Sequence, residues 1–441
     1  MTPETPIDLE DDHAHVWHPF TQAQTAQPPL AVVSGKGASL FTADGREILD
    51  LISSWWVNIH GHAHPKIAQA LAEQANRLEQ VIFADFTHAP AVDLAKQLSA
   101  VLPAGLTRIF FSDNGSTSVE IALKIAWQYW INLGSPQRRR YLALEGAYHG
   151  DTFGAMSAGA SSGFYDPFRP LLFQVDTIPF PETWLDDPDV DAKEAASLAA
   201  LDRWLERNGK ELAAFIAEPL VQGAAGMRMC RPSFMASEVA SIRAADGLII
   251  FDEVMTGFGR TGTLFASEQI GVSPDLICLS KGLTGGFLPL SVTACTRAIY
   301  EAFLGTGFDR AFAHGHSFTA NPLGCAAALA SLQISRSPET SQAWQRIESK
   351  HREGLARLAK IPTLRHFRIQ GTIAACNIDL PGTAYGAATS LALKKNFLAR
   401  GLLIRPMGPV LYILPPYCIS DAELDRAYTA IAEVVTTISA V

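Results

Sequence analysis

Short apolar runs alternate with amphipathic stretches between about residues 107 and 320. This alternation is typical of an α/β domain built on a mostly parallel sheet. The apolar runs contain few polar residues, as expected for strands that are buried on both faces. The predicted strands are 108–111, 140–144, 213–217, 248–251 and 276–279.

The two ends of the chain have a different pattern. The first 60 residues are irregular and contain many prolines, and the residues after about 325 mix helices with short strands that end at 411–416. A chain of 441 residues is longer than one hydrophobic core usually supports. We therefore predict a smaller α+β domain made from both ends (1–60 and 325–441) and a large α/β domain over 61–324.

Polar residues directly follow several of the predicted strands. In open α/β sheets, ligands bind beyond the carboxyl ends of the strands, so these residues are expected to meet at one site. They are Asn114, Gly115, Ser116, Glu218, Asp252, Glu253, Ser280 and Lys281.

Segment 113–118 (DNGSTS) follows a strand and begins a helix, because apolar residues recur after it at helical spacing. Gly115 allows a ligand to approach the backbone closely, and Ser116 and Thr117 supply hydroxyls and N-cap character. The unpaired amides and the dipole at a helix start attract an anion such as phosphate. An ordinary helix cap is the alternative interpretation.

Lys281 and Asp252 each stand at the end of an apolar strand. Burial lowers the pKa of a lysine, and the neutral amine can attack an aldehyde to form an imine. A carboxylate such as Asp252 can keep a pyridine nitrogen protonated. Alternatively, Lys281 is a surface lysine with its stem along apolar surface, and Asp252 is a helix cap or metal ligand.

A phosphate site, an acid for a ring nitrogen and an imine-forming lysine together fit one cofactor, pyridoxal phosphate. Lys281 would carry it as a Schiff base and, once released, move the substrate proton, while Asp252 would keep the ring an electron acceptor.

Three motifs also resemble those of the class III aminotransferases, and the resemblance spans nearly the whole chain. It implies the fold type I of pyridoxal-phosphate transferases and a homodimer with shared active sites. The motifs are 252–262 (DEVMTGFGRTG), 280–282 (SKG) and 314–322 (HGHSFTANP). By this resemblance the cofactor-binding residues are Gly115, Ser116, Tyr148, Asp252, Val254, Lys281, His316 and Ser317. Val254 would pack on the ring, and His316 and Ser317 would contact the phosphate of the neighbouring subunit.

Four further stretches resemble those class III enzymes that transfer the amino group of S-adenosylmethionine to 8-amino-7-oxononanoate in biotin biosynthesis. The stretches are 17–20 (WHPF), 53–56 (SSWW), 148–156 (YHGDTFGAM) and 404–417 (IRPMGPVLYILPPY). The resemblance implies a ping-pong reaction through pyridoxamine phosphate that yields 7,8-diaminononanoate. It makes Lys281, Asp252 and Tyr148 catalytic, and gives as substrate-binding residues Phe20, Trp55, Trp56, Tyr148, Asp151, Gly315 and Arg405.

Arg405 is expected to bind the carboxylate of the oxo acid, since a guanidinium presents a planar fork of donors. Trp55 and Tyr148 suit a long aliphatic chain or, by cation–π attraction, a sulfonium. Core packing is the alternative role for the two tryptophans. The alternative function is a class III transaminase of another ω-amine, diamine or lysine donor; a lyase or aminomutase on the same fold and a non-enzymatic protein are further alternatives.

Composition and charge exclude several other classes of protein. Hydrophobic residues make up 48% and charged residues 18%, which is typical of a compact protein with a large interior. The net charge of -9 argues against binding to nucleic acid or anionic lipid. The sequence has neither a signal peptide nor an apolar run long enough to span a membrane, so we expect a cytoplasmic protein. The six cysteines are scattered, without a C-x-x-C pair, and are expected to be buried apolar residues.

Two motifs point to chemistry that their context does not support. Segment 257–262 (GFGRTG) fits the dinucleotide-binding pattern, but its glycines do not open a helix directly after a strand. His60, His62 and His64 look like a metal cluster, yet no acid or cysteine pattern accompanies them. We therefore predict neither a nicotinamide cofactor nor a metal.

Phe20 occupies a position where the class usually has a tyrosine whose hydroxyl helps to recognise both substrates. Tyr148 is our hypothesis for a compensating donor. Replacing Phe20 by tyrosine should tighten binding of S-adenosylmethionine by about 1 kcal/mol, the usual contribution of a hydrogen bond. The apparent affinity of the two proteins for this donor is the measurement, and an unchanged or weaker affinity in Phe20→Tyr would count against this account.

Overall fold

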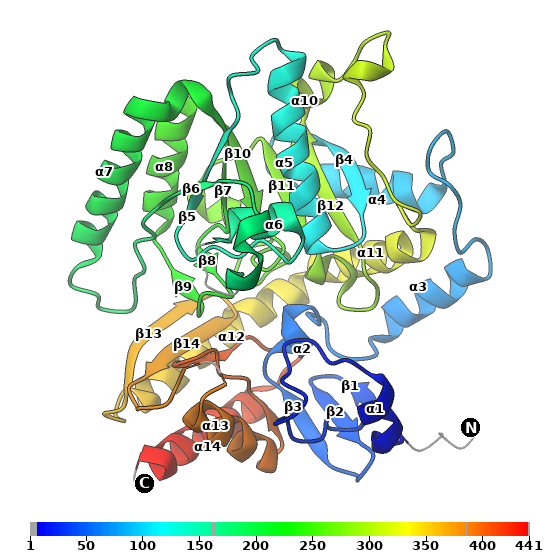
Figure 1. Cartoon of the computed structure of the whole chain (residues 1–441). Coiled ribbons are helices and arrows are strands. Elements are labelled where there is room, and N and C mark those ends of the chain that lie inside the picture. The colour runs from blue at the N-terminus through cyan, green and yellow to red at the C-terminus, as the bar shows by residue number, and fades with distance from the viewer. Residues whose placement is uncertain (1–6, 161–164, 385, 440–441) are drawn as a thin grey trace.

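The computed structural model describes residues 7–160, 165–384 and 386–439. Its upper part, in the view of Figure 1, is built on a seven-stranded sheet with the order β4-β12-β11-β10-β7-β5-β6. The strands are β4 (Leu106–Ser112), β5 (Arg140–Leu144), β6 (Asp176–Ile178), β7 (Leu212–Ala217), β10 (Leu248–Asp252), β11 (Leu276–Leu279) and β12 (Ser291–Thr296).

The sheet is parallel except around one strand. β6, β5, β7, β10 and β11 pair in parallel, whereas β12 is antiparallel to both β11 and β4. β4 therefore runs in the same direction as β11. The mostly parallel sheet and its five predicted strands are confirmed, and β6 and β12 are additions. The sequence did not predict these two strands. β6 is only three residues long, and three hydroxyl residues in β12 (SVTACT) interrupt the apolar pattern expected of a buried strand.

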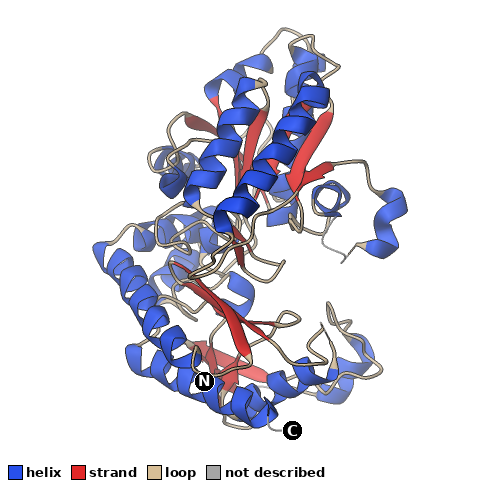
Figure 2. Ribbon diagram, turned by 90° about the vertical axis from the view of Figure 1, so that its left-hand side faces the viewer, coloured by secondary structure: helices blue, strands red, loops and turns tan. Residues whose placement is uncertain are grey.

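Alternate residues of the strands face two separate hydrophobic cores. In β10, Ile249 and Phe251 belong to one core, and Leu248 and Ile250 belong to the other. This is the two-residue period of a strand that is covered on both faces. Helices lie on both sides of the upper strands in Figure 2.

One face of the sheet is covered mainly by α5 (Gly115–Asn132), with α6 (Phe153–Ala158) and α10 (Arg297–Ala302) beside it. The other core includes residues of five further helices of this part. The five helices are α4 (Ala89–Ser99), α7 (Val190–Asn208), α8 (Pro232–Ala244), α9 (Ala266–Ile270) and α11 (Pro322–Ser335). α3 (Pro65–Ala75) packs against one of them, α11. Short 3-10 turns occur at η2 (Asp166–Leu171), η3 (Gly209–Glu211), η4 (Lys281–Thr284) and η5 (Phe308–Arg310), and a small hairpin pairs β8 (Val221–Gln222) with β9 (Arg228–Met229).

The lower part of Figure 1 is made from both ends of the chain. One sheet there has the order β1-β2-β3-β15, and the parallel pair Leu49 and Leu402 joins the beginning of the chain to its end. Its strands are β1 (Val32–Lys36), β2 (Ser39–Thr42), β3 (Glu47–Asp50) and β15 (Leu402–Leu403). The second sheet contains β13 (Leu364–Gln370), β14 (Ile373–Ile378) and β16 (Val410–Ile413), and the helices are α1 (Leu9–His15), α2 (Ser53–Trp56), α12 (Pro338–Leu358), α13 (Ala388–Ala399) and α14 (Asp421–Ser439). Domain boundaries at residues 60 and 324 stay a prediction.

Five of the six cysteines are buried, as expected, but Cys418 is exposed. Among the helices that the structure describes, none is both long and apolar enough to cross a membrane.

Close packing of α12 on α14 depends on a glycine. A Cβ on Gly354 would overlap the ring of Tyr428. Gly354→Ala should therefore lower the free energy of unfolding by about 1–3 kcal/mol, the usual effect of overpacking a core, as measured by urea denaturation.

Gly209 provides the matched control for that substitution. It has a helical φ of −55°, and a Cβ there would lie 3.5 Å from the Cβ of Ala245, an ordinary contact. Gly209→Ala should leave stability unchanged or raise it by about 0.4–1 kcal/mol. Equal stability of the two variants would show that α12 and α14 can shift apart without loss.

Candidate active site

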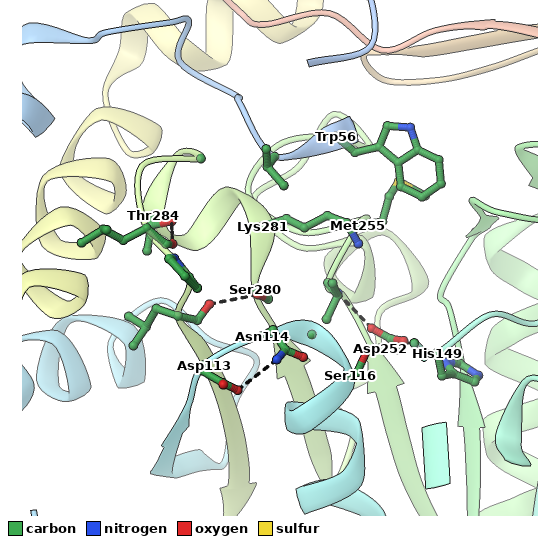
Figure 3. Close-up of a pocket in the computed structure, with 18 of the residues that line it drawn as sticks. Trp56, Asp113, Asn114, Ser116, His149, Asp252, Met255, Ser280, Lys281 and Thr284 are labelled. Carbon is green, nitrogen blue, oxygen red and sulfur yellow. Dashed lines mark hydrogen bonds and ion pairs between the residues drawn. The ribbon is translucent and has the colours of Figure 1, made fainter. Parts of the chain in front are cut away.

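A cavity of about 450 Å³ lies at the carboxyl edge of the large sheet. Figure 3 shows that side chains following β4, β10 and β11 point into it. The predicted site residues that line this cavity are Trp56, Asn114, Gly115, Ser116, Tyr148, Glu218, Asp252, Val254, Ser280 and Lys281.

Helix α5 begins at one wall of the cavity, and its cap differs from the predicted one. Asn114 is the N-cap, since its side chain accepts a hydrogen bond from the Thr117 amide at 3.1 Å. The Thr117 hydroxyl turns back to Asp113 and the backbone of Asn114, so it contributes to the cap rather than to an anion site. Gly115 and Ser116 are the first helical residues, whose amides have no acceptor within the helix.

Gly115 also fixes how closely the helix approaches β10. A Cβ at this position would come within 2.7 Å of Cγ1 of Val254. The helix start and the valine that follows Asp252 therefore touch only because residue 115 is glycine.

Lys281 begins η4, and only Ser280 separates it from the end of β11. Its φ of 46° is in the left-handed region, which is uncommon for a residue with a side chain and is typical of strained functional positions. Figure 3 shows its Nζ between the Trp56 ring and the Asp252 carboxylate, and Nζ lies 5.5 Å from the ring centroid. Burial lowers the pKa of Lys281, although the nearby carboxylates of Asp252, Glu218 and Asp151 act in the opposite direction.

Asp252 is buried and paired with a histidine that the sequence did not single out. Nδ1 of His149 lies 2.7 Å from Oδ2 of Asp252, and the other carboxylate oxygen accepts a hydrogen bond from the Val254 amide. Because a carboxylate only accepts, the His149 proton faces Asp252. This contact fixes the orientation of the carboxylate.

Glu218 brings a second buried carboxyl to the cavity. It accepts hydrogen bonds from the amides of Tyr148 and Gly223, at 3.0 and 2.9 Å. Burial raises the pKa of Glu218 to about 7, with His149 opposing that rise. Glu253, by contrast, accepts hydrogen bonds from the amides of Ala266 and Ser267. It therefore caps α9 rather than contributing to the cavity.

Tyr148 belongs to a chain of polar contacts beside the cavity. Its hydroxyl donates to Oδ2 of Asp151 at 3.0 Å, and the Asp151 amide donates to Oγ of Ser116 at 3.0 Å. Tyr165, which the sequence did not indicate, stacks on Tyr148 and donates to the carbonyl of Gly150. Burial, reinforced by Asp151, raises the pKa of Tyr148 above its ordinary value, so its hydroxyl stays a donor.

Trp55, Phe20 and Arg405 form a second group. The Arg405 guanidinium lies 4.8 Å from the centroid of the Trp55 ring, and Phe20 packs edge-on against the same ring at 5.5 Å. Phe20 is 50% exposed and Trp55 is 40% exposed, which does not fit a purely core role for this tryptophan. Trp56 faces the cavity instead, so adjacent residues serve different surfaces.

Gly315, His316 and Ser317 lie away from this cavity. Gly315 and Ser317 are exposed, and the Ser317 carbonyl accepts a hydrogen bond from Gln80. Among the described residues, no group of three or more histidine, cysteine or acidic side chains is arranged to hold a metal. His62 instead lies 3.0 Å from the buried carboxylate of Asp50.

The residues at the cavity fit pyridoxal phosphate. The free amides at the start of α5 suit its phosphate, and the buried Asp252 suits its ring nitrogen. A lysine with a lowered pKa suits its aldehyde, because more of the amine is neutral. Of the residues missed from the sequence, His149 lies within the motif that supplied Tyr148 and Asp151, but nothing local indicated its pairing with Asp252.

Comparison with known proteins gives the same family along nearly the whole chain. The class-III aminotransferase family model matches residues 20–435. An adenosylmethionine-8-amino-7-oxononanoate aminotransferase of Synechococcus elongatus is 55% identical over 426 residues, which cover 97% of this chain and 99% of the relative. The enzyme of the same name from Geobacter sulfurreducens is 37% identical, with 97% of each chain covered.

Solved structures agree with the sequence relatives. An adenosylmethionine-8-amino-7-oxononanoate aminotransferase of Methanocaldococcus jannaschii superposes with a TM-score of 0.90 at 31% identity, covering 97% of this chain and 98% of that one. A PLP-bound amine transaminase from an uncultivated Pseudomonas species gives a TM-score of 0.89 at 29% identity, with 96% and 98% coverage.

The contact of Gly115 with Val254 leads to a test of the cofactor site. A methyl group at residue 115 would push Val254 and the helix start apart, so Gly115→Ala should weaken cofactor binding by about 1–3 kcal/mol. Cofactor retained after gel filtration, measured by its absorbance, is the readout. Gly209→Ala, remote from the cavity, is the control, and full retention in Gly115→Ala would mean that this contact does not shape the site.

Proposed function

The chain belongs to the class-III aminotransferases, and from that premise we propose that it transfers the amino group of S-adenosylmethionine to 8-amino-7-oxononanoate, giving 7,8-diaminononanoate in biotin biosynthesis. Full-length similarity to relatives named for these compounds carries the proposal. The Arg405 and Trp55 group supports it, because it offers a cation and an aromatic face to a long oxo acid.

Family membership confirms three predictions made from the sequence: a pyridoxal-phosphate enzyme, aminotransferase activity and the fold type I α/β architecture. Bound pyridoxal phosphate supplies an electron sink for the carbanion that forms when a substrate amine loses its α-proton. The protein's own residues determine where the substrates bind and where protons move.

Lys281 is the proposed attachment residue and proton carrier. Its lowered pKa leaves more of the amine neutral, which favours both attack on an aldehyde and acceptance of a proton. Asp252, oriented by His149, would hold the ring nitrogen of the cofactor. Gly115 and Ser116 would bind the phosphate, with Val254 against the ring.

The two substrates use the same site in turn. Arg405 would hold the distant carboxylate of the oxo acid, while Trp55 and Phe20 would line its aliphatic chain. Tyr148 and Asp151, joined by a hydrogen bond, form the polar side that would meet the donor amine.

The proposed working unit is a homodimer in the cytoplasm. Gly315, His316 and Ser317 lie away from the cavity of their own chain and are partly or fully exposed. In a dimer they are available to the neighbouring site, His316 and Ser317 for the cofactor phosphate and Gly315 for substrate.

Each half of the reaction gives a separate test. S-adenosylmethionine, mixed with the loaded enzyme in the absence of an acceptor, should change the absorbance spectrum of the bound cofactor. Addition of 8-amino-7-oxononanoate should reverse that change and yield 7,8-diaminononanoate, detected by mass spectrometry. Lys281→Ala is the control and should show no turnover. Inertness towards S-adenosylmethionine together with a response to lysine or another amine would overturn the proposed donor.

A further inference from the structure

Trp55 and Trp56 lie on a single turn of left-handed helix that contains no glycine. Ser53, Ser54, Trp55 and Trp56 have φ values of 49°, 45°, 75° and 73°. The amides of Trp56 and Val57 donate to the carbonyls of Ile52 and Ser53, at 2.8 and 3.0 Å. Left-handed helix is unfavourable for every L-residue with a Cβ, so neighbouring contacts must hold this turn in place.

Asp50 provides the buried anchor of the turn. Its carboxylate is fully buried and accepts hydrogen bonds from the amide of Ile52 at 3.2 Å and from Oγ of Ser54 at 2.7 Å. Nε2 of His62 lies 3.0 Å from Oδ2 of the same carboxylate. Three donors thus converge on one side chain at the end of β3.

His62 completes the network on the other side. Its Nδ1 lies 2.8 Å from the side-chain nitrogen of Asn58, which can only donate. Nδ1 is therefore the acceptor and Nε2 carries the proton that it donates to Asp50. The central histidine of the 60–64 motif is a partly buried hydrogen-bond bridge between Asn58 and Asp50.

Contacts from the rest of the chain hold the outer side of the turn. Ser53 donates to the carbonyl of Leu414, and the Trp56 indole donates to the hydroxyl of Tyr412. Arg260, within the glycine-rich motif, donates to the carbonyls of Trp56 and Pro415. The Ser54 side chain is held by Asp50. Because Ser54 directly precedes Trp55, this hydrogen bond fixes the backbone from which the Trp55 side chain projects.

We propose that Asp50, acting through Ser54 and braced by His62, is a positioning residue for substrate binding. It holds the left-handed turn that turns Trp56 towards the cavity and keeps Trp55 against Arg405 and Phe20. This inference rests on the proposed function, because it assigns Trp55 and Arg405 to the oxo acid. Both contact the substrate far from its reacting ketone, so loss of position weakens binding with little effect on the chemical step.

Two substitutions of Ser54 test the anchor. Ser54→Ala removes the donor to Asp50, and Ser54→Gly removes it while relieving the backbone strain of positive φ. We expect both to raise KM for 8-amino-7-oxononanoate about tenfold, as for the loss of a hydrogen bond to a charged group, with kcat within about twofold of wild type. The amides of Trp56 and Val57 should also exchange hydrogen faster in the substrate-free variants.

Ser39→Ala is the matched control. Ser39 donates to the Glu47 carboxylate at 2.6 Å, so the variant loses a similar bond in the same small sheet but away from the turn. It should leave KM and exchange at the turn unchanged.

The outcomes separate this inference from the proposed function. A wild-type enzyme inert towards 8-amino-7-oxononanoate would overturn the proposed function itself. With an active wild type, an unchanged KM in Ser54→Ala would overturn the positioning role, and so would a raised KM without faster exchange. A wild-type KM in Ser54→Gly would show that backbone preference, rather than the bond to Asp50, sets the turn.

Discussion

The cavity is organised around the buried pair formed by Asp252 and His149. Parallel strands end at one edge of the sheet, and β10 delivers Asp252 there between the start of α5 and Lys281. A buried carboxylate needs hydrogen-bond partners, because burying an unpaired polar group costs free energy. His149 and the Val254 amide are these partners, and they fix the orientation of the carboxylate. Burial of Lys281 lowers the pKa of its amine, while the carboxylates of three nearby acids act in the opposite direction.

The large sheet alone does not complete the site. Trp55, Trp56 and Arg405 come from the two ends of the chain, which meet through the pairing of β3 with β15. Arg405 lies just beyond β15, and the tryptophans lie just beyond β3, so this short parallel pair sets the spacing between a cation and its aromatic neighbour. If Trp55 and Arg405 bind substrate as proposed, the chain ends determine which substrate fits while the large sheet carries the proposed cofactor site.

The residues that could be predicted from the sequence are those whose role follows from the pattern of their immediate neighbours in the chain. The strands that end in Asp252 and at Lys281 are apolar runs with one polar terminus, and the start of α5 follows from Gly115 and the helical spacing after it. The direction of β12 and the pairing of His149 with Asp252 depend on contacts between distant segments. No local pattern encodes them, and the same holds for Tyr165, which stacks on a residue 17 positions earlier in the chain.

The turn at residues 53–56 could not be predicted from its own sequence. Segment SSWW carries no glycine or asparagine, so its composition predicts neither a left-handed turn nor a separation of the two indoles. Four residues in that region cost about 1–2 kcal/mol each, a sum comparable with the stability of a whole domain. Hydrogen bonds that the turn donates to Asp50, Leu414 and Tyr412, and one that it accepts from Arg260, offset that strain. The partners in these bonds are up to 361 positions away, so the geometry of the turn is a property of the assembled fold and not of the SSWW segment itself.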